Sequence, residues 1–516
     1  MKNCYIHYDI SRGRIPKKET IYQHIDILHS YGLNGILFYM ESVINTRAFP
    51  ACGCGNTPLT VDYIQELSSY LRTKEMDFIP LFQVLGHQKN LLSCDPNMAN
   101  YRERDKDCGT FRIDSPRTRK KIKQWLAELI PLFDSEYIHI GSDEVWDIGL
   151  GKSKSFVEKN GYEEAVADYL NDIAQFISTQ GKKVILYADF LIHYPKLRNL
   201  LREDLIICNW GYGTKTEQYE KENHNFAMHE YITEGRRNWV TGNNMAEYII
   251  TPFNRLQENV SVWLELGGKS KADTFLISDW GSYENVNPFI LSIIGDVYIL
   301  KRLQDASFSL EQLAVEISNI IFGAEHNKFK ELLIRLLSAQ NNKDYFGSRV
   351  MNYGPHFPAL LYDDPDSQQL IRICSCLEED GLILFEQEAR EIMEGFEKLK
   401  EPKDNKNGFL NDLKALSRRL LMIALRARLC FDHTWYTGAV WLTAKDIFPS
   451  EDRLKEYKTL AQKDIDWYMH KWEAENLETC QDNCKRYMEE AIFSTDKTIH
   501  KPQNSMLYFP PDSASS

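Results

Sequence analysis

Residues 136–144 read Glu-Tyr-Ile-His-Ile-Gly-Ser-Asp-Glu, an apolar run typical of a buried strand that ends in a glycine and two adjacent carboxylates. Helical periodicity precedes this run over Pro116–Phe133 and follows it over Glu163–Gln180. A proline at position 116 suits the first turn of a helix, where its missing N–H would have no partner in any case. The sequence therefore predicts a strand at Glu136–Gly141, enclosed between two amphipathic helices.

The same alternation of strand and helix continues through the first 300 residues. The predicted strands are Tyr5–Asp9, Gly35–Met40, Asp77–Phe82, Glu136–Gly141, Lys183–Ala188, Asp204–Asn209, Asn238–Thr241 and Thr274–Asp279. The further predicted helices are Lys18–Tyr31, Val61–Thr73, Met245–Glu265 and Pro288–Leu303. The strand near residue 240 has an equally apolar competitor in Phe226–Glu230, and one of the two is expected to lie in an excursion from the fold.

Repeated strand–helix units predict parallel strands that are joined by right-handed crossovers. Eight such units close into a (β/α)8 TIM barrel, which is an α/β fold. The structural alternative is a doubly wound open sheet. It is disfavoured because no glycine-rich nucleotide-binding loop follows any of the early strands.

After residue 305 the strand signals fade and helical periodicity dominates. The predicted helices are Ser309–Phe322, Lys328–Gln340, Asp366–Lys400, Phe409–Thr434 and Glu451–Glu473. We therefore divide the chain into a catalytic barrel over 1–304, a mainly α-helical C-terminal domain over 305–505 and a flexible tail over 506–516. The helical domain is expected to complete the rim of the site, to pack against the barrel or to mediate a homodimer, and the sequence does not choose between these roles.

Composition limits the possible partners and location. The 516 residues carry a net charge of -13, which repels phosphate backbones and argues against a nucleic-acid partner. His7 and Asp9 interrupt the apolar N-terminal residues, so we expect no signal-peptide core there. No stretch approaches the ~20 apolar residues of a membrane span. We expect a cytoplasmic protein that has no membrane partner.

The cysteines indicate neither a disulfide framework nor a metal centre. They number 11, which is odd, and this favours reduced thiols. The pairs Cys52/Cys54 and Cys480/Cys484 have no histidine or second cysteine pair at the spacing of a zinc site. We therefore expect no metal and no cofactor.

The chemistry is predicted at the carboxyl ends of the strands, where the active site of a barrel enzyme lies. Asp143 and Glu144 follow the fourth strand directly. A like charge next door, together with apolar walls, raises the pKa of one carboxyl so that it holds a proton near neutral pH while the other stays ionised. An acidic pair that only caps the next element is the alternative. The placement of the whole segment His139–Glu144 favours catalytic carboxylates.

The segment His139-Ile-Gly-Ser-Asp-Glu144 resembles the His-x-Gly-Gly-Asp-Glu motif that glycoside hydrolase family 20 carries at the end of its fourth barrel strand. Ser142 replaces one of the family's glycines, and a small residue still fits there. Further stretches resemble the first, second, third and eighth strands of the hexosaminidase D-like branch of that family. They are Ile6–Asp9, Gly32–Tyr39, Ile79–His87 and Phe275–Glu284.

This resemblance covers roughly residues 5–300 and implies a retaining exo-β-N-acetylhexosaminidase. Glu144 would then be the general acid and base, and Asp143 would orient the 2-acetamido group of the substrate. The oxygen of that group would attack the anomeric carbon and form an oxazolinium-like intermediate, with no protein nucleophile. The implied partner is a glycan or oligosaccharide with a terminal β-linked N-acetylhexosamine.

The resemblance also implies a set of substrate-binding residues. Tyr212 would bind the acetamido carbonyl, and Trp280 would stack on the pyranose ring. Trp210 and Tyr187 are lesser wall candidates, since family members often have tryptophan where Tyr187 stands. Either Arg12 or Arg14 would reach the sugar hydroxyls. The complete set is Tyr212, Trp280, Glu284, His87, His139, Trp210, Asp9, Arg12, Tyr187 and Asp189.

Two alternatives to this function stay open. A related exo-glycosidase of the same fold would prefer a disaccharide, a sulfated sugar or a non-acetylated hexose. A barrel that binds sugar without catalysis is the other alternative. Asp143 and Glu144 argue against the second alternative, because binding alone needs no proton donor.

Overall fold

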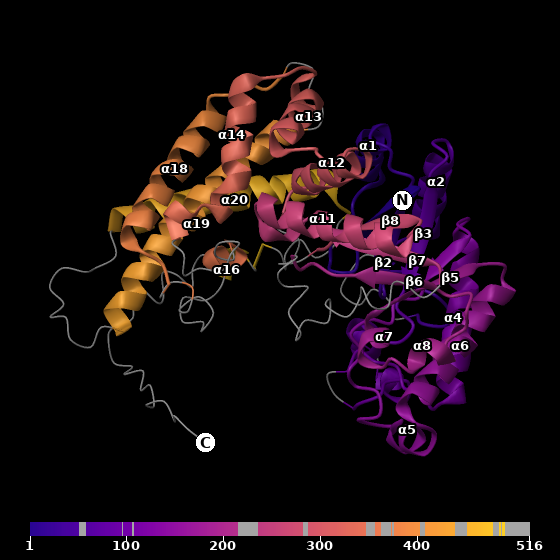
Figure 1. The fold of residues 1–516 in the computed structure, drawn as a ribbon. Coiled ribbons are helices and arrows are strands. Elements are labelled where there is room, and N and C mark those ends of the chain that lie inside the picture. The colour runs from indigo at the N-terminus through magenta and orange to yellow at the C-terminus, as the bar shows by residue number, and fades with distance from the viewer. Residues whose placement is uncertain are drawn as a thin grey trace.

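The computed structural model describes residues 1–50, 58–94, 96–105, 108–214, 236–281, 287–346, 357–362, 373, 376–402, 408–438, 451–477, 485–486 and 488–490. Its N-terminal part is a closed barrel of eight parallel strands, β1 to β8, in which each strand pairs with its neighbours in the sequence and β8 pairs with β1 (Figure 1). Closure confirms the TIM barrel prediction and excludes the open sheet.

The strands lie close to their predicted positions. They are β1 (Asn3–Asp9), β2 (Gly35–Met40), β3 (Asp77–Phe82), β4 (Tyr137–His139), β5 (Lys183–Tyr187), β6 (Ile206–Trp210), β7 (Asn238–Asn243) and β8 (Thr274–Asp279). The structure confirms the strand near residue 240, and its competitor Phe226–Glu230 lies outside the described residues. β4 is shorter than predicted because Gly141 and Ser142 have φ of 60° and 72°, which turns the chain out of the strand.

Helices cover the outside of the barrel. The longer ones are α1 (Lys18–Ser30), α2 (Val61–Arg72), α4 (Pro116–Leu129), α6 (Tyr162–Thr179), α11 (Phe253–Ser270) and α12 (Ile290–Gln304). Short helices α3 (Lys89–Cys94), α5 (Lys154–Asn160), α7 (Asp189–His193) and α8 (Leu197–Leu200) were not predicted. The predicted helix Met245–Glu265 is wrong at its start, because Pro252 disfavours helical backbone at Thr251 and the helix begins only at Phe253.

The inside of the barrel is a packed core. It consists of Tyr5, Leu37, Tyr39, Ile79, Leu81, Tyr137, Ile185, Tyr187, Ile206, Cys208, Trp210, Trp239 and Leu276. Tyr212 and Trp280 pack against this core and are themselves only partly buried. The barrel is therefore filled, and its aromatic side chains form a floor beneath the carboxyl ends of the strands.

The described residues beyond α12 form helices and no strand, which confirms a mainly helical C-terminal region. They are α13 (Leu310–Phe322), α14 (Asn327–Ser338), α15 (Lys343–Phe346), α16 (Phe357–Tyr362), α18 (Glu379–Glu397), α19 (Phe409–Gly438) and α20 (Glu451–Glu475). The predicted helix Asp366–Lys400 is interrupted at Glu378, which has extended backbone (φ -116°, ψ 140°), and α18 begins after it. The predicted start at Asp366 lies outside the described residues. The exact division at residue 304 stays a prediction.

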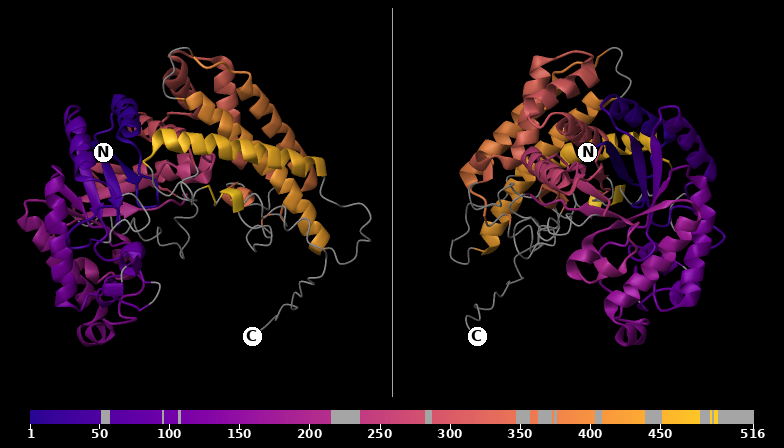
Figure 2. Two further views of the ribbon diagram at one scale, coloured as in Figure 1. Left: turned by 180° about the vertical axis from the view of Figure 1, so that it is seen from behind. Right: turned by 45° about the vertical axis from the view of Figure 1, so that its right-hand side comes forward.

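The helical region packs against the barrel, which is one of the three roles that the sequence left open. Figure 2 shows α20 running from the helical bundle to the N-terminal strands. At its end, the Lys17 N–H donates to the Glu475 carbonyl at 2.7 Å, and the Leu477 N–H donates to the Ile15 carbonyl at 2.8 Å. The loop after β1 is thus fixed by backbone hydrogen bonds from the C-terminal region.

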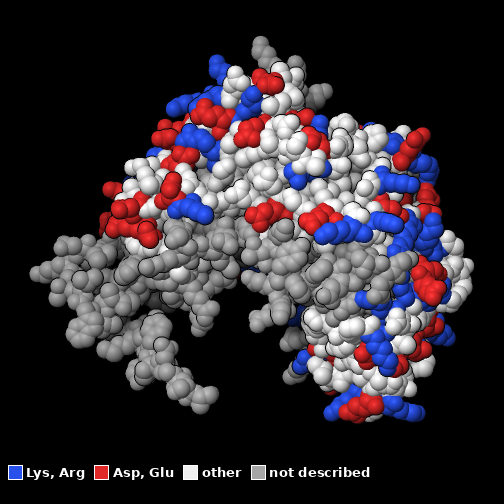
Figure 3. Space-filling view, in the orientation of Figure 1, with Lys and Arg blue, Asp and Glu red and all other residues white. Residues whose placement is uncertain are grey.

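The surface carries charges of both signs. On the face that Figure 3 shows, lysine and arginine side chains are interspersed with aspartate and glutamate. Cys4, Cys108, Cys208, Cys376 and Cys430 carry free thiols. Within the described part of the chain, no helix combines the length and apolarity that crossing a bilayer requires.

Candidate active site

The turn after β4 has a strained backbone at the mouth of the barrel, by which we mean the carboxyl ends of the strands and the residues that follow them. Ser142 and Glu144 have φ of 72° and 50°, in the left-handed region that costs an L-residue roughly 1–2 kcal/mol. Gly141 has φ of 60°, and a Cβ there would lie 2.1 Å from the Gln83 side-chain oxygen. Surrounding contacts must therefore hold this turn in place.

Gln83, at the end of β3, holds one side of the turn. Its buried amide oxygen accepts the Ser142 N–H at 2.9 Å, and its Nε2 donates to Asp143 Oδ1 at 2.7 Å. The side chain thus fixes both the backbone of the turn and the orientation of the Asp143 carboxylate. No role was predicted for Gln83, although it lies in the stretch Ile79–His87 that carried the family resemblance.

Asp189, the first residue of α7, holds the other side. Its Oδ2 accepts the Glu144 N–H at 2.7 Å, and its Oδ1 accepts the Trp210 indole N–H at 3.5 Å. Burial and the nearby Asp143 charge raise the pKa of Asp189. The structure therefore places this predicted substrate-binding residue against the backbone of Glu144.

His87 lies between the two adjacent carboxylates. Its Nδ1 is 3.7 Å from Asp143 Oδ1, and its Nε2 is 3.5 Å from Glu144 Oε2. Burial disfavours the charged imidazole, but Asp143, Glu144 and Glu41 outweigh it and raise the pKa of His87 to about 9. The Asp143 side chain is 8% exposed and that of Glu144 is 49% exposed. One carboxylate is thus enclosed, while the other reaches solvent.

Glu41 is a further acid at the mouth that the sequence interpretation missed. It directly follows β2, and the Tyr39 hydroxyl donates to its Oε1 at 3.0 Å. Burial and the neighbouring Asp9 raise the pKa of Glu41 to about 7, against the opposing charges of Arg12 and His87. The search for polar residues at strand ends would have found Glu41 if it had been extended by one residue beyond Met40.

The loop after β1 supplies an ion pair. Asp9 pairs with Arg12 and accepts the Gly281 N–H at 3.2 Å, which ties the ends of β1 and β8 together. Burial opposes ionisation of Asp9, but Arg12 and hydrogen bonds from Ser11 lower its pKa. The Arg12 guanidinium lies 4.9 Å from the centroid of the Trp280 ring.

Arg14 points elsewhere. Its Nη1 donates to the Asn287 carbonyl at 3.0 Å, and its guanidinium lies 4.1 Å from the Phe289 ring centroid. Of the two arginines that the sequence proposed, the structure therefore brings Arg12 to the Trp280 ring and places Arg14 against the residues just before α12.

The structure brings Tyr212 and Trp280, two of the predicted substrate-binding residues, into direct contact. The Trp280 indole N–H donates to the Tyr212 hydroxyl at 2.8 Å, and the same hydroxyl lies 3.3 Å from Ser278 Oγ. The Trp210 ring lies 5.4 Å from that of Tyr212. These rings form a continuous aromatic wall from β6 to β8.

Tyr187 and His139 lie deeper. Both are buried, and their ring centroids are 4.2 Å apart. His139 Nδ1 accepts the Gly141 N–H at 3.0 Å, and burial lowers the pKa of His139, which keeps the ring neutral. His139 therefore supports the turn, whereas His87 contacts the carboxylates. Glu284 lies outside the described residues.

The same centre could offer ligands to a cation. One atom each of His87, Asp143 and Glu144 lies within 4.8 Å of the others. With its pKa raised to about 9, His87 carries a proton at neutral pH, and a metal ion would have to displace that proton. The absence of a metal stays a prediction from the sequence.

Comparison with known proteins finds a family match over part of the barrel. Residues 53–274 match the model described as glycosyl hydrolase family 20, catalytic domain. Hexosaminidase D from Bos taurus is 21% identical over 310 residues, which cover 54% of this chain and 84% of the relative. A lacto-N-biosidase from Bifidobacterium bifidum is 26% identical over 174 residues, which cover 31% of this chain and 15% of the relative.

Among solved structures, an exo β-N-acetylglucosaminidase from Vibrio harveyi in complex with N-acetylglucosamine aligns with a TM-score of 0.48 and 13% identity, covering 65% of this chain and 58% of that chain. The barrel, its paired carboxylates and the sequence matches define a glycoside hydrolase. Residues 53–274 match the family that the motif at His139–Glu144 predicted, glycosyl hydrolase family 20. The family match ends at residue 274, so the helical region lies beyond it.

Proposed function

We propose that this chain is a retaining exo-β-N-acetylhexosaminidase that hydrolyses terminal β-linked GlcNAc or GalNAc by substrate-assisted catalysis. The observation that carries the proposal is the unequal environment of two adjacent carboxylates. Asp143 is enclosed and held by Gln83, while Glu144 reaches solvent on a turn that Asp189 fixes. Neighbouring acids in different environments can take different roles.

Glu144 transfers the proton in this proposal. It protonates the glycosidic oxygen as the bond from that oxygen to the anomeric carbon breaks, and it later removes a proton from the attacking water. His87, whose pKa of about 9 keeps it positive, lies 3.5 Å away and stabilises the carboxylate that Glu144 becomes. Solvent exposure of Glu144 lets the departing group and the incoming water reach it.

Asp143 acts on the acetamido group. Its fixed carboxylate accepts the acetamido N–H and stabilises the positive charge that grows as the acetamido oxygen attacks the anomeric carbon. The Tyr212 hydroxyl, oriented by Trp280, donates to that oxygen. Water then opens the oxazolinium-like intermediate from the face that the leaving group left, so the configuration is retained.

The remaining side chains bind the sugar ring. Trp280 stacks on the pyranose, and Arg12, held by its ion pair with the buried Asp9, binds hydroxyls through charge-assisted hydrogen bonds. Trp210 and Tyr187 line the base of the site, and Glu284 keeps its predicted role in hydroxyl binding. Because Arg12 is 40% exposed at the mouth, its guanidinium is accessible to a ligand.

The direct test is hydrolysis of p-nitrophenyl β-GlcNAc and β-GalNAc, together with inhibition by a thiazoline that mimics the oxazoline. Turnover of both N-acetylated substrates, with no turnover of p-nitrophenyl β-glucoside, supports the proposal. Preference for the glucoside would remove the role of Asp143 and favour an exo-glycosidase with another sugar preference. A p-nitrophenyl lacto-N-bioside tests the disaccharide alternative, and sugar binding without hydrolysis would indicate a non-catalytic barrel.

The proposal includes two further properties of the whole protein. We propose that it is cytoplasmic, which fractionation of the producing cells tests. We also propose that the helical region mediates a homodimer, which light scattering at several protein concentrations tests. Neither property is needed for the chemistry at the barrel mouth.

A further inference from the structure

An exposed tryptophan stands two residues beyond the proposed general acid. Trp146 is 58% exposed, while Val145 between it and Glu144 is buried. Single exposed apolar side chains are common on proteins, so exposure alone argues for nothing. Two further observations indicate a function for Trp146. It lies next to a proposed proton donor, and hydrogen bonds fix the loop that follows it.

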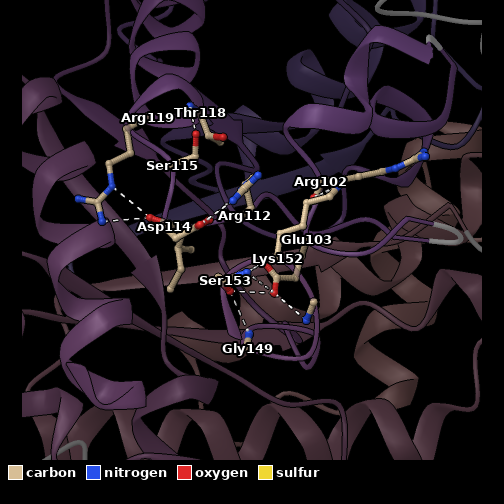
Figure 4. Close-up of polar contacts among 12 residues, drawn as sticks. Arg102, Glu103, Arg112, Asp114, Ser115, Thr118, Arg119, Gly149, Lys152 and Ser153 are labelled. Atoms are coloured by element: carbon tan, nitrogen blue, oxygen red, sulfur yellow. Dashed lines mark hydrogen bonds and ion pairs between the residues drawn. The ribbon is translucent and has the colours of Figure 1, made fainter. Parts of the chain in front are cut away.

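A buried carboxylate fixes the loop that follows Trp146. Glu103 accepts the Gly151 N–H at 3.0 Å, the Ser153 N–H at 3.1 Å and the Ser153 hydroxyl at 2.8 Å, and Figure 4 shows Ser153 beside it. The Gly149 N–H in turn donates to Ser153 Oγ at 3.2 Å. Because the loop is already ordered, a ligand that binds it loses little free energy to loop ordering.

Helix α7 connects Trp146 to the catalytic turn. His193 at its end contacts the Trp146 ring edge to face, with centroids 5.0 Å apart and an interplanar angle of 79°. Asp189 at its start accepts the Glu144 N–H. The same short helix thus holds both the proton donor and the indole, and their relative position is fixed.

We propose that Trp146 is a platform for the sugar ring of the leaving group, which is the pyranose linked to the terminal hexosamine through the oxygen that Glu144 protonates. This assignment rests on the proposed function. A general acid must face the leaving oxygen, so the leaving group lies on the solvent side of Glu144, away from the enclosed Asp143. An indole presented there offers an apolar face to the C–H face of a pyranose. The substrate class is therefore oligosaccharides in which a second sugar ring follows the terminal hexosamine.

The test compares two substrates that share the terminal sugar and differ in the leaving group. One is a disaccharide of two β-linked GlcNAc residues, and the other is β-GlcNAc fluoride, whose leaving group has no ring. Trp146→Ala is expected to lower kcat/KM for the disaccharide by at least about tenfold, which corresponds to about 1.4 kcal/mol, and to leave the fluoride nearly unchanged. Trp146→Phe keeps a smaller ring and is expected to fall between Trp146→Ala and the wild type on the disaccharide only.

Leu150→Ala is the matched control, because Leu150 is 67% exposed in the same loop but lies six residues after Glu144 in the sequence. Leu150→Ala is expected to leave kcat/KM unchanged for both substrates. An equal loss on both substrates in Trp146→Ala would show that Trp146 supports Glu144 and would overturn the platform. An unchanged disaccharide rate would overturn it as well. If the wild type hydrolyses neither substrate, the proposed function fails and the platform fails with it. If the wild type hydrolyses the fluoride but not the disaccharide, the proposed function stands and the platform alone is overturned.

Discussion

At the mouth of the barrel, His87 lies 3.7 Å from Asp143 and 3.5 Å from Glu144, whereas between α19 and α20 the Arg419 Nε donates to the two oxygens of Asp464 at 3.0 and 2.9 Å. Arg419 and Asp464 are both fully buried, whereas at the mouth Asp143 is enclosed and Glu144 reaches solvent. In the helical region the cation and its carboxylate meet at hydrogen-bond distance. At the mouth, Asp143 and Glu144 share the single imidazolium of His87 at longer distances.

A second cluster in the helical region also places a cation at close range, although two carboxylates share it. Lys471 Nζ lies 3.0 Å from Asp412 Oδ2 and 2.8 Å from Glu475 Oε1. Burial raises the pKa of Asp412 to about 8, Lys471 opposes that shift, and the neighbouring Glu475 adds to it. Buried charge is tolerated there because each charged group has a close opposite charge.

At the mouth, the negative charge of the acids is less completely balanced by cations than it is in the helical region. Burial raises the pKa of Glu41 to about 7 and also raises that of Asp189, while Asp143 lies beside them with His87 as a shared cation. Crowded acids of this kind destabilise a fold but provide groups that exchange protons near neutral pH. The comparison teaches that paired buried charge supports the fold, and that crowded charge supports the chemistry. Mutations in the two regions should therefore separate activity from stability.

The largest expected effect comes from Glu144→Gln. Loss of the proton donor should lower kcat on p-nitrophenyl β-GlcNAc by about 10²- to 10⁴-fold. The midpoint of thermal unfolding should not fall, because the side chain is half exposed and the substitution removes a charge from an acidic cluster. Glu158→Gln, on an exposed pair with Lys154 in α5, is the control for activity and stability. Retained turnover in Glu144→Gln would contradict the assignment.

The opposite result is expected from Arg419→Met. Removing this cation leaves Asp464 buried without its partner, which should cost about 3–5 kcal/mol in the free energy of unfolding measured with urea. The kcat/KM of the folded protein should stay close to that of the wild type. The double variant Arg419→Met with Asp464→Leu should recover most of the stability. A loss of kcat/KM at full folding would break the proposed separation between the two regions.

A smaller effect is expected at Asp189, where the Glu144 backbone is held. Asp189→Ala removes the acceptor of the Glu144 N–H and should lower kcat by about tenfold to hundredfold through misplacement of the turn, with a smaller change in KM. Asp189→Asn keeps an oxygen that can accept this bond and should retain much more activity. If the two variants lose equal activity, the charge or proton of Asp189 matters and the hydrogen bond does not.

The barrel could be predicted from the sequence because each strand is a short apolar run bounded by polar or turn residues. This local pattern was sufficient even for β7, the weakest of the eight predictions. The start of α11 was missed because apolar periodicity extends upstream of Pro252, and the effect of that proline on Thr251 outweighs the periodicity.

The site could be predicted only in part. Asp143, Glu144, Tyr212 and Trp280 stand at strand ends, where a barrel enzyme places its chemistry, and the structure brings them to one mouth. Gln83 could not be assigned because its partner is 60 residues away in the sequence. That contact exists because β3 pairs with β4, and the amide then faces the turn. Residues that act by holding other residues carry no signal in their own neighbourhood.

The smallest expected effect concerns the pH dependence of stability at Glu41. Its pKa is about 7 in the folded protein and 4.5 as the ordinary value, so folding favours the protonated form. The stability that Glu41 contributes is therefore fully present below pH 4.5 and is lost as the pH rises through about 7. Glu41→Gln cannot ionise, so its free energy of unfolding relative to the wild type should improve by on the order of 1 kcal/mol between acid and mildly alkaline pH. Urea unfolding of both proteins across this range measures the difference, with Glu158→Gln as the exposed control. A difference that does not change with pH would mean that the ionised Glu41 is fully neutralised by Arg12 and His87, and the mouth would then resemble the paired charges of the helical region.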